Sequence, residues 1–337
     1  MPAGAQHANT HGRRAWRFVR WLGRAAAGAS IAVASGVAPA APLTLALAEL
    51  PAFAPALIAA AEGYFAAAGL ELKILPCVNG SACMQLMIDG RAQLATVADI
   101  PLVLAAHAGV PFQIIATMGA SAREHSLVAR SDRGIRSPAD LQGKRIGFVR
   151  GTSSHYFTES FLLYHGIARS SITLVALDPA TAAEQLARGE VDAAGLYQPQ
   201  GPRALLLLGA QGLTLPNPRS YTVTINVVAQ PAVADDDLLR VLRALSRAEK
   251  LIDREPERAR SVLAARLHLD RPTMATFWGQ YNFRLALNQS LITTLEGQSR
   301  WALREGLVKP GATPDFLDRL RPGPLKALNP RAVSVVN

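Results

Sequence analysis

The fold is decided by one stretch of the chain, which reads Lys144-Arg145-Ile146-Gly147-Phe148-Val149-Arg150-Gly151-Thr152-Ser153-Ser154-His155-Tyr156. Its apolar first half ends at a glycine, and hydroxyl residues then begin an amphipathic segment. This order predicts a strand, a tight turn and a helix. Ser153 or Ser154 is expected to cap that helix. Its first N–H groups and the positive end of its dipole suit an anion or a polar ligand, whereas capping without a ligand is the alternative.

Strands and helices alternate along the chain from Leu43, with short connections between them. The expected strands are residues 43–48, 71–75, 92–97, 112–118, 144–149, 172–176 and 191–196. The expected helices are residues 56–68, 82–88, 100–108, 137–141, 179–188, 235–253, 257–267 and 290–304, together with one from the Thr-Ser-Ser turn to Gly166. This alternation predicts an α/β fold with largely parallel sheets that are covered on both faces.

Two further extended segments, residues 126–130 and 222–229, are expected to cross between two lobes. Residues 41–125 and 225–337 would form lobe 1, and residues 126–224 would form lobe 2. Such an arrangement is a hinged clamshell. Because ligands of open α/β sheets bind at the carboxyl ends of the strands, the cleft between the lobes is the expected binding site.

The first forty residues are predicted to be a cleavable export signal. They contain five arginines and no acid, then a short apolar stretch from Ala25 to Val37, and then Ala38-Pro39-Ala40 as a cleavage site. The pair Arg13-Arg14 is compatible with the twin-arginine route, and an ordinary secretory signal is equally compatible. No cysteine lies near the cleavage site, so a lipid anchor is not expected. We expect a soluble monomer in the periplasm.

The net charge of +10 for 337 residues does not indicate a polyanionic partner. Without the arginines of the first forty residues, 30 basic residues face 25 acidic ones. A surplus of that size needs no nucleic acid to balance it. The length and the 50% hydrophobic content allow a sizeable core and two lobes.

The two cysteines, Cys77 and Cys83, lie six positions apart. In an oxidising compartment they could form a disulfide across a turn. Buried thiols are the second possibility, and a catalytic thiol is the least favoured, because no histidine or acid lies close in sequence. Two cysteines alone do not make a zinc site, and no metal or other cofactor is expected.

Several motifs together resemble the nitrate, sulfonate and taurine (NMT1/THI5-like) type of ABC-importer substrate-binding proteins. The first helix of that family typically contains Ala-x-x-x-Gly-Tyr-Phe-x-x-x-Gly-Leu, and an Asp-Gly turn, an Asp-x-Pro loop and the start of a second lobe follow in order. The matching segments are Phe53–Leu70, Asp89–Ala95, Val97–Pro101, Ile135–Gly147 and Gly151–Tyr156. The sequence departs from the family at Gln93, where an acid is common.

The resemblance implies a type II periplasmic-binding-protein clamshell that traps a small organic anion of the sulfonate, taurine or nitrate type. It also implies delivery to a membrane permease and its ATPase, without catalysis. The ligand-facing positions carried over are Leu50, Pro51, Ala52, Gly80, Ser81, Asp99, Ile100, Gly151, Thr152, Ser153, Ser154, His155, Tyr197 and Gln198. Gln198 stands where the family usually has an acid, a difference that bears on which ligand is accepted.

For several single residues, a purely structural role is an alternative to ligand contact. Ser81 could cap its helix, and capping is favoured for Asp99. His155 is expected to be exposed or hydrogen-bonded locally, and it could add positive charge at mildly acid pH. Asn226 stands where an apolar residue is expected and is added to the candidate ligand contacts. Arg123 and Glu124 are expected to form a surface pair.

The alternative function is an enzyme on the same fold, because relatives of this family include pyrimidine-precursor synthases and a desulfinase. Such enzymes need a positioned nucleophile, and Cys77 and Cys83 have no evident base beside them. A transcription regulator shares the clamshell, but the forty signal-like residues leave no room for a DNA-binding domain ahead of it.

Overall fold

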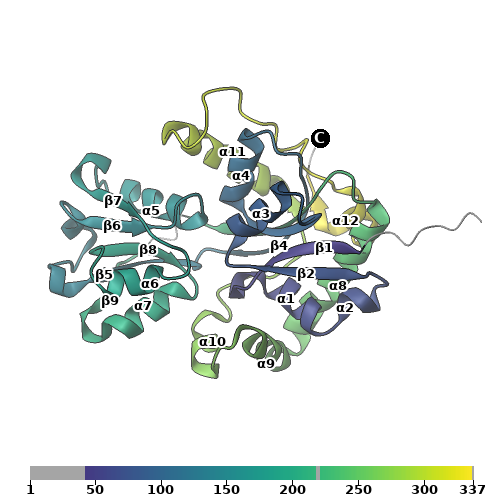
Figure 1. Ribbon diagram of the computed structural model, residues 1–337, viewed down its shortest axis with the longest axis horizontal. Helices are drawn as coiled ribbons and strands as arrows, with labels where there is room; N and C mark the ends of the chain where they lie inside the picture. Colours follow the sequence, from purple (N-terminus) through teal and green to yellow (C-terminus); the bar gives the residue numbers. More distant parts are fainter. Residues whose placement is uncertain (1–41, 218–220, 336–337) are drawn as a thin grey trace, which may run out of the picture. The chain divides into compact units, whose positions relative to one another are not determined.

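The computed structural model describes residues 42–217 and 221–335, which contain two five-stranded sheets with helices on their faces (Figure 1). The proposed signal, residues 1–40, lies outside the described residues. Over the described ranges, every helix falls short of the length and apolarity that a membrane span requires. The expected α/β class is confirmed.

The first sheet contains strands from the beginning of the chain and one strand that returns late. In spatial order its strands are β2 (Leu72–Cys77), β1 (Leu43–Ala48), β3 (Leu94–Ala98), β10 (Val223–Ala229) and β4 (Gln113–Ser121). β1 pairs in parallel with β2 and β3, whereas β10 is antiparallel to both of its neighbours. Its runs of buried alanine, leucine, isoleucine and valine fit a sheet covered on both faces.

Helices cover the first sheet on both faces, as Figure 1 shows. One face carries α3 (Gly80–Ile88), α4 (Asp99–His107) and α11 (Gln289–Arg304). The other carries α1 (Ala54–Ala61), α2 (Tyr64–Ala67) and α8 (Asp235–Arg254), with α9 (Pro256–Leu267) beside α1 and α8. The single helix expected over residues 56–68 is split into α1 and α2 at Gly63, whose φ of +68° lies in the left-handed region.

The second sheet is built from the middle of the chain. Its strands are, in spatial order, β7 (Thr173–Ala176), β6 (Arg145–Phe148), β8 (Ala193–Tyr197), β5 (His125–Arg130) and β9 (Gly212–Thr214). β6 is parallel to β7 and β8, and β5 is antiparallel to β8 and β9. The helices that pack on this sheet are α5 (Ser153–Tyr164), α6 (Ala182–Ala187) and α7 (Gln200–Leu208).

The sheets are mixed rather than largely parallel, and the reason lies in how the chain passes between them. The segments expected as crossings are strands inside the sheets: residues 126–130 belong to β5, and residues 223–229 form β10. The chain passes from the first sheet into β5 and from the second sheet into β10. Each of these strands is antiparallel to the neighbouring strand of the sheet that it joins. Between β4 and β5 the connection consists of only three residues, Ala122-Arg123-Glu124.

Several elements were not expected from the sequence. These are α7, β9, α10 (Arg271–Phe277), α12 (Gly323–Leu328) and the small sheet of β11 (Leu287–Asn288) and β12 (Val333–Ser334). The short 3-10 helices are η1 (Pro51–Phe53), η2 (Ser131–Arg133), η3 (Pro138–Leu141), η4 (Arg169–Ser171), η5 (Gly209–Gln211) and η6 (Pro330–Ala332). The helix expected over residues 137–141 is η3.

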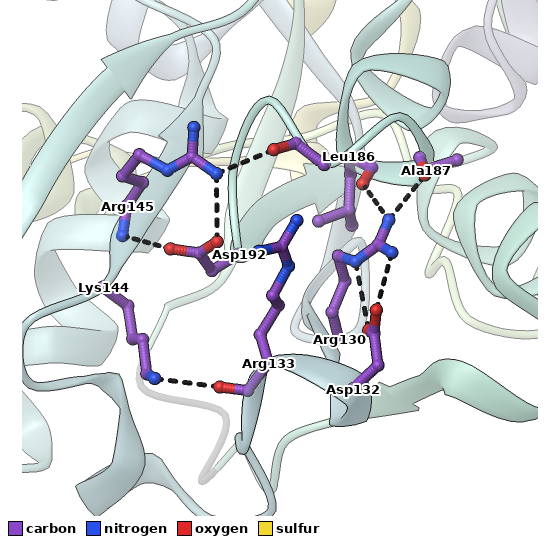
Figure 2. A network of polar contacts seen from close by, with 9 residues as sticks. Arg130, Asp132, Arg133, Lys144, Arg145, Leu186, Ala187 and Asp192 are labelled. Carbon is purple, nitrogen blue, oxygen red and sulfur yellow. Dashed lines mark hydrogen bonds and ion pairs between the residues drawn. The ribbon is translucent and has the colours of Figure 1, made fainter.

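A network of charged side chains ties together strand ends in the second sheet (Figure 2). Arg145 donates to Asp192 from its main-chain N–H and from Nη2, at 2.9 and 3.1 Å. Arg130 forms an ion pair with Asp132 and donates to main-chain carbonyls of α6. Lys144 donates from Nζ to the carbonyl of Arg133. The network lies at the beginning of β6, whereas the turn into α5 follows its end.

A disulfide joins Cys77 at the end of β2 to Cys83 within α3, with the two Cα atoms 5.5 Å apart. Of the alternatives that the sequence left open, the structure shows the paired one. The bond encloses the segment Asn79-Gly80-Ser81, which begins α3. It therefore fixes the position of a helix start relative to the first sheet.

We expect the double substitution Cys77→Ser and Cys83→Ser to lower the free energy of unfolding by about 2 kcal/mol, because opening so short a loop frees the unfolded chain. Urea denaturation followed by circular dichroism measures this. The wild-type protein in excess reductant should show the same loss, and the variant should not respond to reductant. A wild-type midpoint that reductant leaves unchanged would show that the bond contributes nothing.

Candidate functional site

A cavity of about 30 Å³ lies between the two sheets, beside the ends of β1, β3 and β8 and the starts of α3 and α5. Its lining residues are Leu50, Ala52, Phe53, Asn79, Gly80, Ser81, Ala98, Pro101, Glu124, Thr152, Ser153, Tyr197, Val223 and Ile225. This is the place where open α/β sheets bind ligands. Seven of the candidate ligand contacts therefore line it: Leu50, Ala52, Gly80, Ser81, Thr152, Ser153 and Tyr197.

The start of α3 forms one side of the cavity. Asn79 caps this helix, because its Oδ1 accepts from the N–H of Ala82 at 2.9 Å. The expectation that Ser81 is the cap is wrong, since the helix begins one residue before it. A Cβ on Gly80 would lie 2.8 Å from the main-chain nitrogen of Ala98, so glycine allows the helix start to approach β3 this closely.

The start of α5 forms the facing side. Thr152 caps this helix by accepting from the N–H of Ser154 at 3.2 Å, and neither Ser153 nor Ser154 is the cap. Ser154 instead donates to the carbonyl of Gly195 and accepts from the N–H of Val149. Both of its hydrogen bonds hold α5 against the second sheet. The φ of +69° at Gly151 allows the sharp turn that precedes the cap.

One hydrogen bond joins the two helix starts. The hydroxyl of Ser81 donates to the carbonyl of Gly151, with 2.8 Å between the oxygens. Because Ser81 belongs to the first sheet's helix and Gly151 to the turn of the second, this bond links the two halves across the cavity. The first N–H groups of α3 and α5 have no carbonyl partner within their own helices and carry partial positive charge. Together they suit the oxygens of an anion.

Glu124 lines the cavity and is buried, with 4% of its surface exposed. The hydroxyl of Tyr281 donates to its Oε2. Burial raises the pKa of Glu124 to about 8, and the hydrogen bond from Tyr281 only partly opposes this shift. The expected surface pair of Arg123 and Glu124 is wrong, because Glu124 is buried while Arg123 is exposed. Arg123 donates instead to the carbonyl of Gly279.

Tyr197 supplies a second buried polar group, with 5% of its surface exposed. Within the described residues its hydroxyl makes no hydrogen bond. Burial raises the pKa of Tyr197 to about 12, and the neighbouring Asn79 side chain acts in the opposite direction, so the hydroxyl stays neutral and able to donate. A buried hydroxyl without a partner costs about 1 to 3 kcal/mol, which a ligand acceptor would recover.

Ser153 and His125 form a hydrogen-bonded pair at the cavity wall, with 2.9 Å between Ser153 Oγ and His125 Nε2. The imidazole ring of His125 stacks on Phe157 and lies against Tyr221. Burial lowers the pKa of His125 to about 3. The imidazole is therefore neutral, and it positions the serine without accepting its proton near neutral pH.

Eight candidate contacts do not line the cavity: Pro51, Asp99, Ile100, Gly151, Ser154, His155, Gln198 and Asn226. Asp99 is the first residue of α4 rather than its cap, and it accepts hydrogen bonds from Tyr221 and from the N–H of Thr224. Asn226 accepts from Thr117 within the first sheet. These bonds give both side chains structural partners, and their contact with a ligand stays a prediction.

His155 does not behave as expected. It is buried, stacked on Phe148 at 4.2 Å between ring centroids and edge-on to Trp301. Burial lowers its pKa to about 4, and the charge of Arg150 acts in the same direction. His155 therefore stays neutral at mildly acid pH and adds no positive charge to the site. The helix start at which it lies is covered by α11, which the sequence did not place there.

Sequence reasoning missed some lining residues. They are Phe53, Ala98, Pro101, Glu124, Val223 and Ile225. The apolar ones resemble any core residue and give no signal. Glu124 could have been found, because an acid between two apolar strands with so short a connection has little room to reach solvent. Among the described residues, no group of three histidine, cysteine or acidic side chains could hold a metal ion.

Comparison with known proteins decides the family. The family model described as "NMT1/THI5 like" matches residues 50–259. The chain belongs to this family. As an NMT1/THI5-like protein it has sequence relatives whose names refer to binding. A protein of Escherichia coli (strain K12) named for binding aliphatic sulfonates is 25% identical over 200 residues, which are 59% of this chain and 63% of the relative.

A second relative from Escherichia coli (strain K12), the taurine-binding periplasmic protein, is 27% identical over 146 residues. This match covers 43% of this NMT1/THI5-like chain and 45% of the relative. The chain therefore spans less than two thirds of the length of either of these two relatives.

Solved structures show that the fold is the two-lobed clamshell of periplasmic binding proteins. The alkanesulfonate-binding protein SsuA of Xanthomonas axonopodis pv. citri, solved with bound MOPS, has a TM-score of 0.71 at 18% identity. The match covers 85% of this NMT1/THI5-like chain and 99% of that one. The desulfurization enzyme DSZB has a TM-score of 0.62 at 19% identity, covering 86% and 99%. At these identities the likeness concerns the fold alone.

The pKa of Glu124 leads to a prediction about stability. The folded value of about 8 lies above the ordinary 4.5, so the folded protein retains a proton that the unfolded chain loses between these values. The resulting stability is complete below pH 4.5 and is lost as the pH rises toward 8. Glu124→Gln cannot lose this proton. We expect its melting temperature, relative to wild type, to rise by roughly 3 °C or more between pH 5 and pH 9.

Scanning calorimetry of both proteins across this pH range measures the difference. Asp99 is also buried with a raised pKa, but it is present in both proteins and cancels in the comparison. A constant difference between the two melting temperatures would show that Glu124 is already ionised at pH 5.

Proposed function

We propose that this chain is the solute-binding component of an ABC importer. It captures a small organic anion of the sulfonate, taurine or nitrate type in the cavity and delivers it to a membrane permease with its ATPase. The observation that carries the proposal is the convergence of two helix starts, from α3 and α5, on one cavity. The family membership and the names of the sequence relatives support it.

The same proposal covers the organisation of the chain. Residues 41–125 and 225–337 act as one lobe and residues 126–224 as the other, and residues 1–40 direct export to the periplasm, where the protein works as a monomer. A cavity of about 30 Å³ has room for little more than water, so a ligand enters only when the lobes separate. Re-forming the bond between Ser81 and Gly151 would then close the site around it.

Enzymatic activity is the second candidate, because a desulfurization enzyme has the same fold. Two observations favour binding. Cys77 and Cys83 are bonded to each other and supply no thiolate. The hydroxyl of Ser153 has a histidine partner, but the lowered pKa of His125 makes it a poor base near neutral pH.

A thermal-shift series tests the binding proposal. A ligand at one hundred times its dissociation constant stabilises the folded state by about 2.7 kcal/mol, which corresponds to roughly 5 °C or more. We expect such a rise with at least one of ethanesulfonate, taurine and nitrate, and none with the uncharged ethanol. A folded protein whose melting temperature responds to none of these anions would contradict the proposed ligand class.

A pair of glycine substitutions tests the site. Gly151 and Gly166 lie just outside the two ends of α5, both with positive φ, at +69° and +65°. Alanine at either position adds similar backbone strain. We expect Gly151→Ala to weaken the binding of the anion found by thermal shift at least tenfold in isothermal titration, and Gly166→Ala to leave it within twofold. Equal losses in both variants would place the ligand away from this helix start.

A further inference from the structure

Glu124 is the only carboxylic acid in the described lining of the cavity. No lysine, arginine or histidine contributes to that lining. The hydroxyls of Ser81 and Thr152 donate to the carbonyls of Gly151 and Val149, and Ser153 is paired with His125. The donors left for a ligand are the N–H groups of the two helix starts, the amide of Asn79 and the hydroxyl of Tyr197. Donors suit the acidic head of a ligand, whereas Glu124 would repel that head on losing its proton and would attract a positive group.

The position of Glu124 is fixed from both sides. Tyr281 donates to its Oε2 and stacks on Phe283, with 5.2 Å between the ring centroids. Main-chain hydrogen bonds between Ala120 and Asn282 hold this tyrosine segment against β4. Because the connection has only three residues, the main chain cannot carry Glu124 away from the cavity. The carboxyl group is therefore built into the wall of the cavity rather than placed there by a mobile loop.

We propose that the ligand is a small dipolar molecule, with an acidic head held by the helix starts and a protonated amine held by Glu124. This inference rests on the proposed function and narrows its ligand class to amino-sulfonates and amino acids of similar size. A ligand ammonium group would form a charge-assisted hydrogen bond with the ionised carboxylate of Glu124. This bond would offset the free-energy cost of removing both groups from water.

The other titratable groups around Glu124 do not take over this role. Tyr281, Tyr197 and Tyr221 have pKa values raised by burial and stay neutral. His125, the next residue in the chain, is held neutral by the burial that lowers its pKa. Near pH 7 the empty site therefore holds one proton on Glu124, and binding of an ammonium group expels it to solvent.

The test compares taurine with ethanesulfonate, which has the same sulfonate and two-carbon chain but no amine. Isothermal titration is carried out on the wild-type protein, on Glu124→Gln and on Glu159→Gln. The last is a matched control, because Glu159 on α5 is a half-buried carboxyl outside the cavity lining. We expect wild type and Glu159→Gln to bind taurine at least tenfold more tightly than ethanesulfonate, and Glu124→Gln to bind the two within threefold.

Titrations at pH 7 in buffers of different ionisation enthalpy give a readout that needs no variant. We expect taurine binding to release close to one proton and ethanesulfonate binding to release none. If wild type binds ethanesulfonate as tightly as taurine, or releases no proton with taurine, the inference is wrong while the proposed function stands. If neither ligand binds and no anion shifts the melting temperature, the proposed function falls as well.

Discussion

The hydrogen bond from Ser81 to the carbonyl of Gly151 is the contact on which the site depends, because it brings two helix starts from different sheets to the same place. Each start is held in position by its own half of the molecule. Asn79 and the disulfide between Cys77 and Cys83 fix α3, whereas Thr152 and Ser154 fix α5. The bond between the two halves is partly buried, and other contacts between them accompany it, such as His155 edge-on to Trp301 and Gln198 donating to Gln280 at 3.4 Å. Each helix start is thus fixed within its own half, which is compatible with a site that opens and closes.

The electrostatics of the cavity follow from the same arrangement. The donors are main-chain N–H groups, the Tyr197 hydroxyl and the Asn79 amide, which bind oxygen without carrying a full charge. Burial keeps Glu124 protonated and His125 neutral, so the empty cavity holds no net side-chain charge near neutral pH. The cluster of arginines shown in Figure 2 lies at the opposite end of β6 and does not add positive charge to the lining. In the proposed function, the direction of these donors would select the ligand.

Most of the architecture could be predicted from the sequence, because long apolar runs bounded by glycine and proline identify strands and helices well. The residues that cap the helices were harder to predict. Asn79 and Thr152 cap where Ser81 and Ser153 or Ser154 were expected, since serine, threonine and asparagine have similar capping strength and one residue of backbone geometry decides among them. The mixed sheets were missed because a local pattern does not show which sheet a strand joins. Seven of the fifteen proposed contacts line the cavity, and Asp99 is an example of the others, held by partners distant in sequence.

The three-residue connection between β4 and β5 has a consequence for sequence change in this protein. Surface connections between strands usually tolerate insertions, because extra residues loop out into solvent. Here the last residue of the connection is Glu124 itself, so one added residue would move its carboxyl group along the chain by about 3.3 Å and out of register with Tyr281. If Glu124 binds the ligand as proposed, the length of this connection is part of the binding chemistry. A related chain with a longer connection here would need a different residue to face the same point of its ligand.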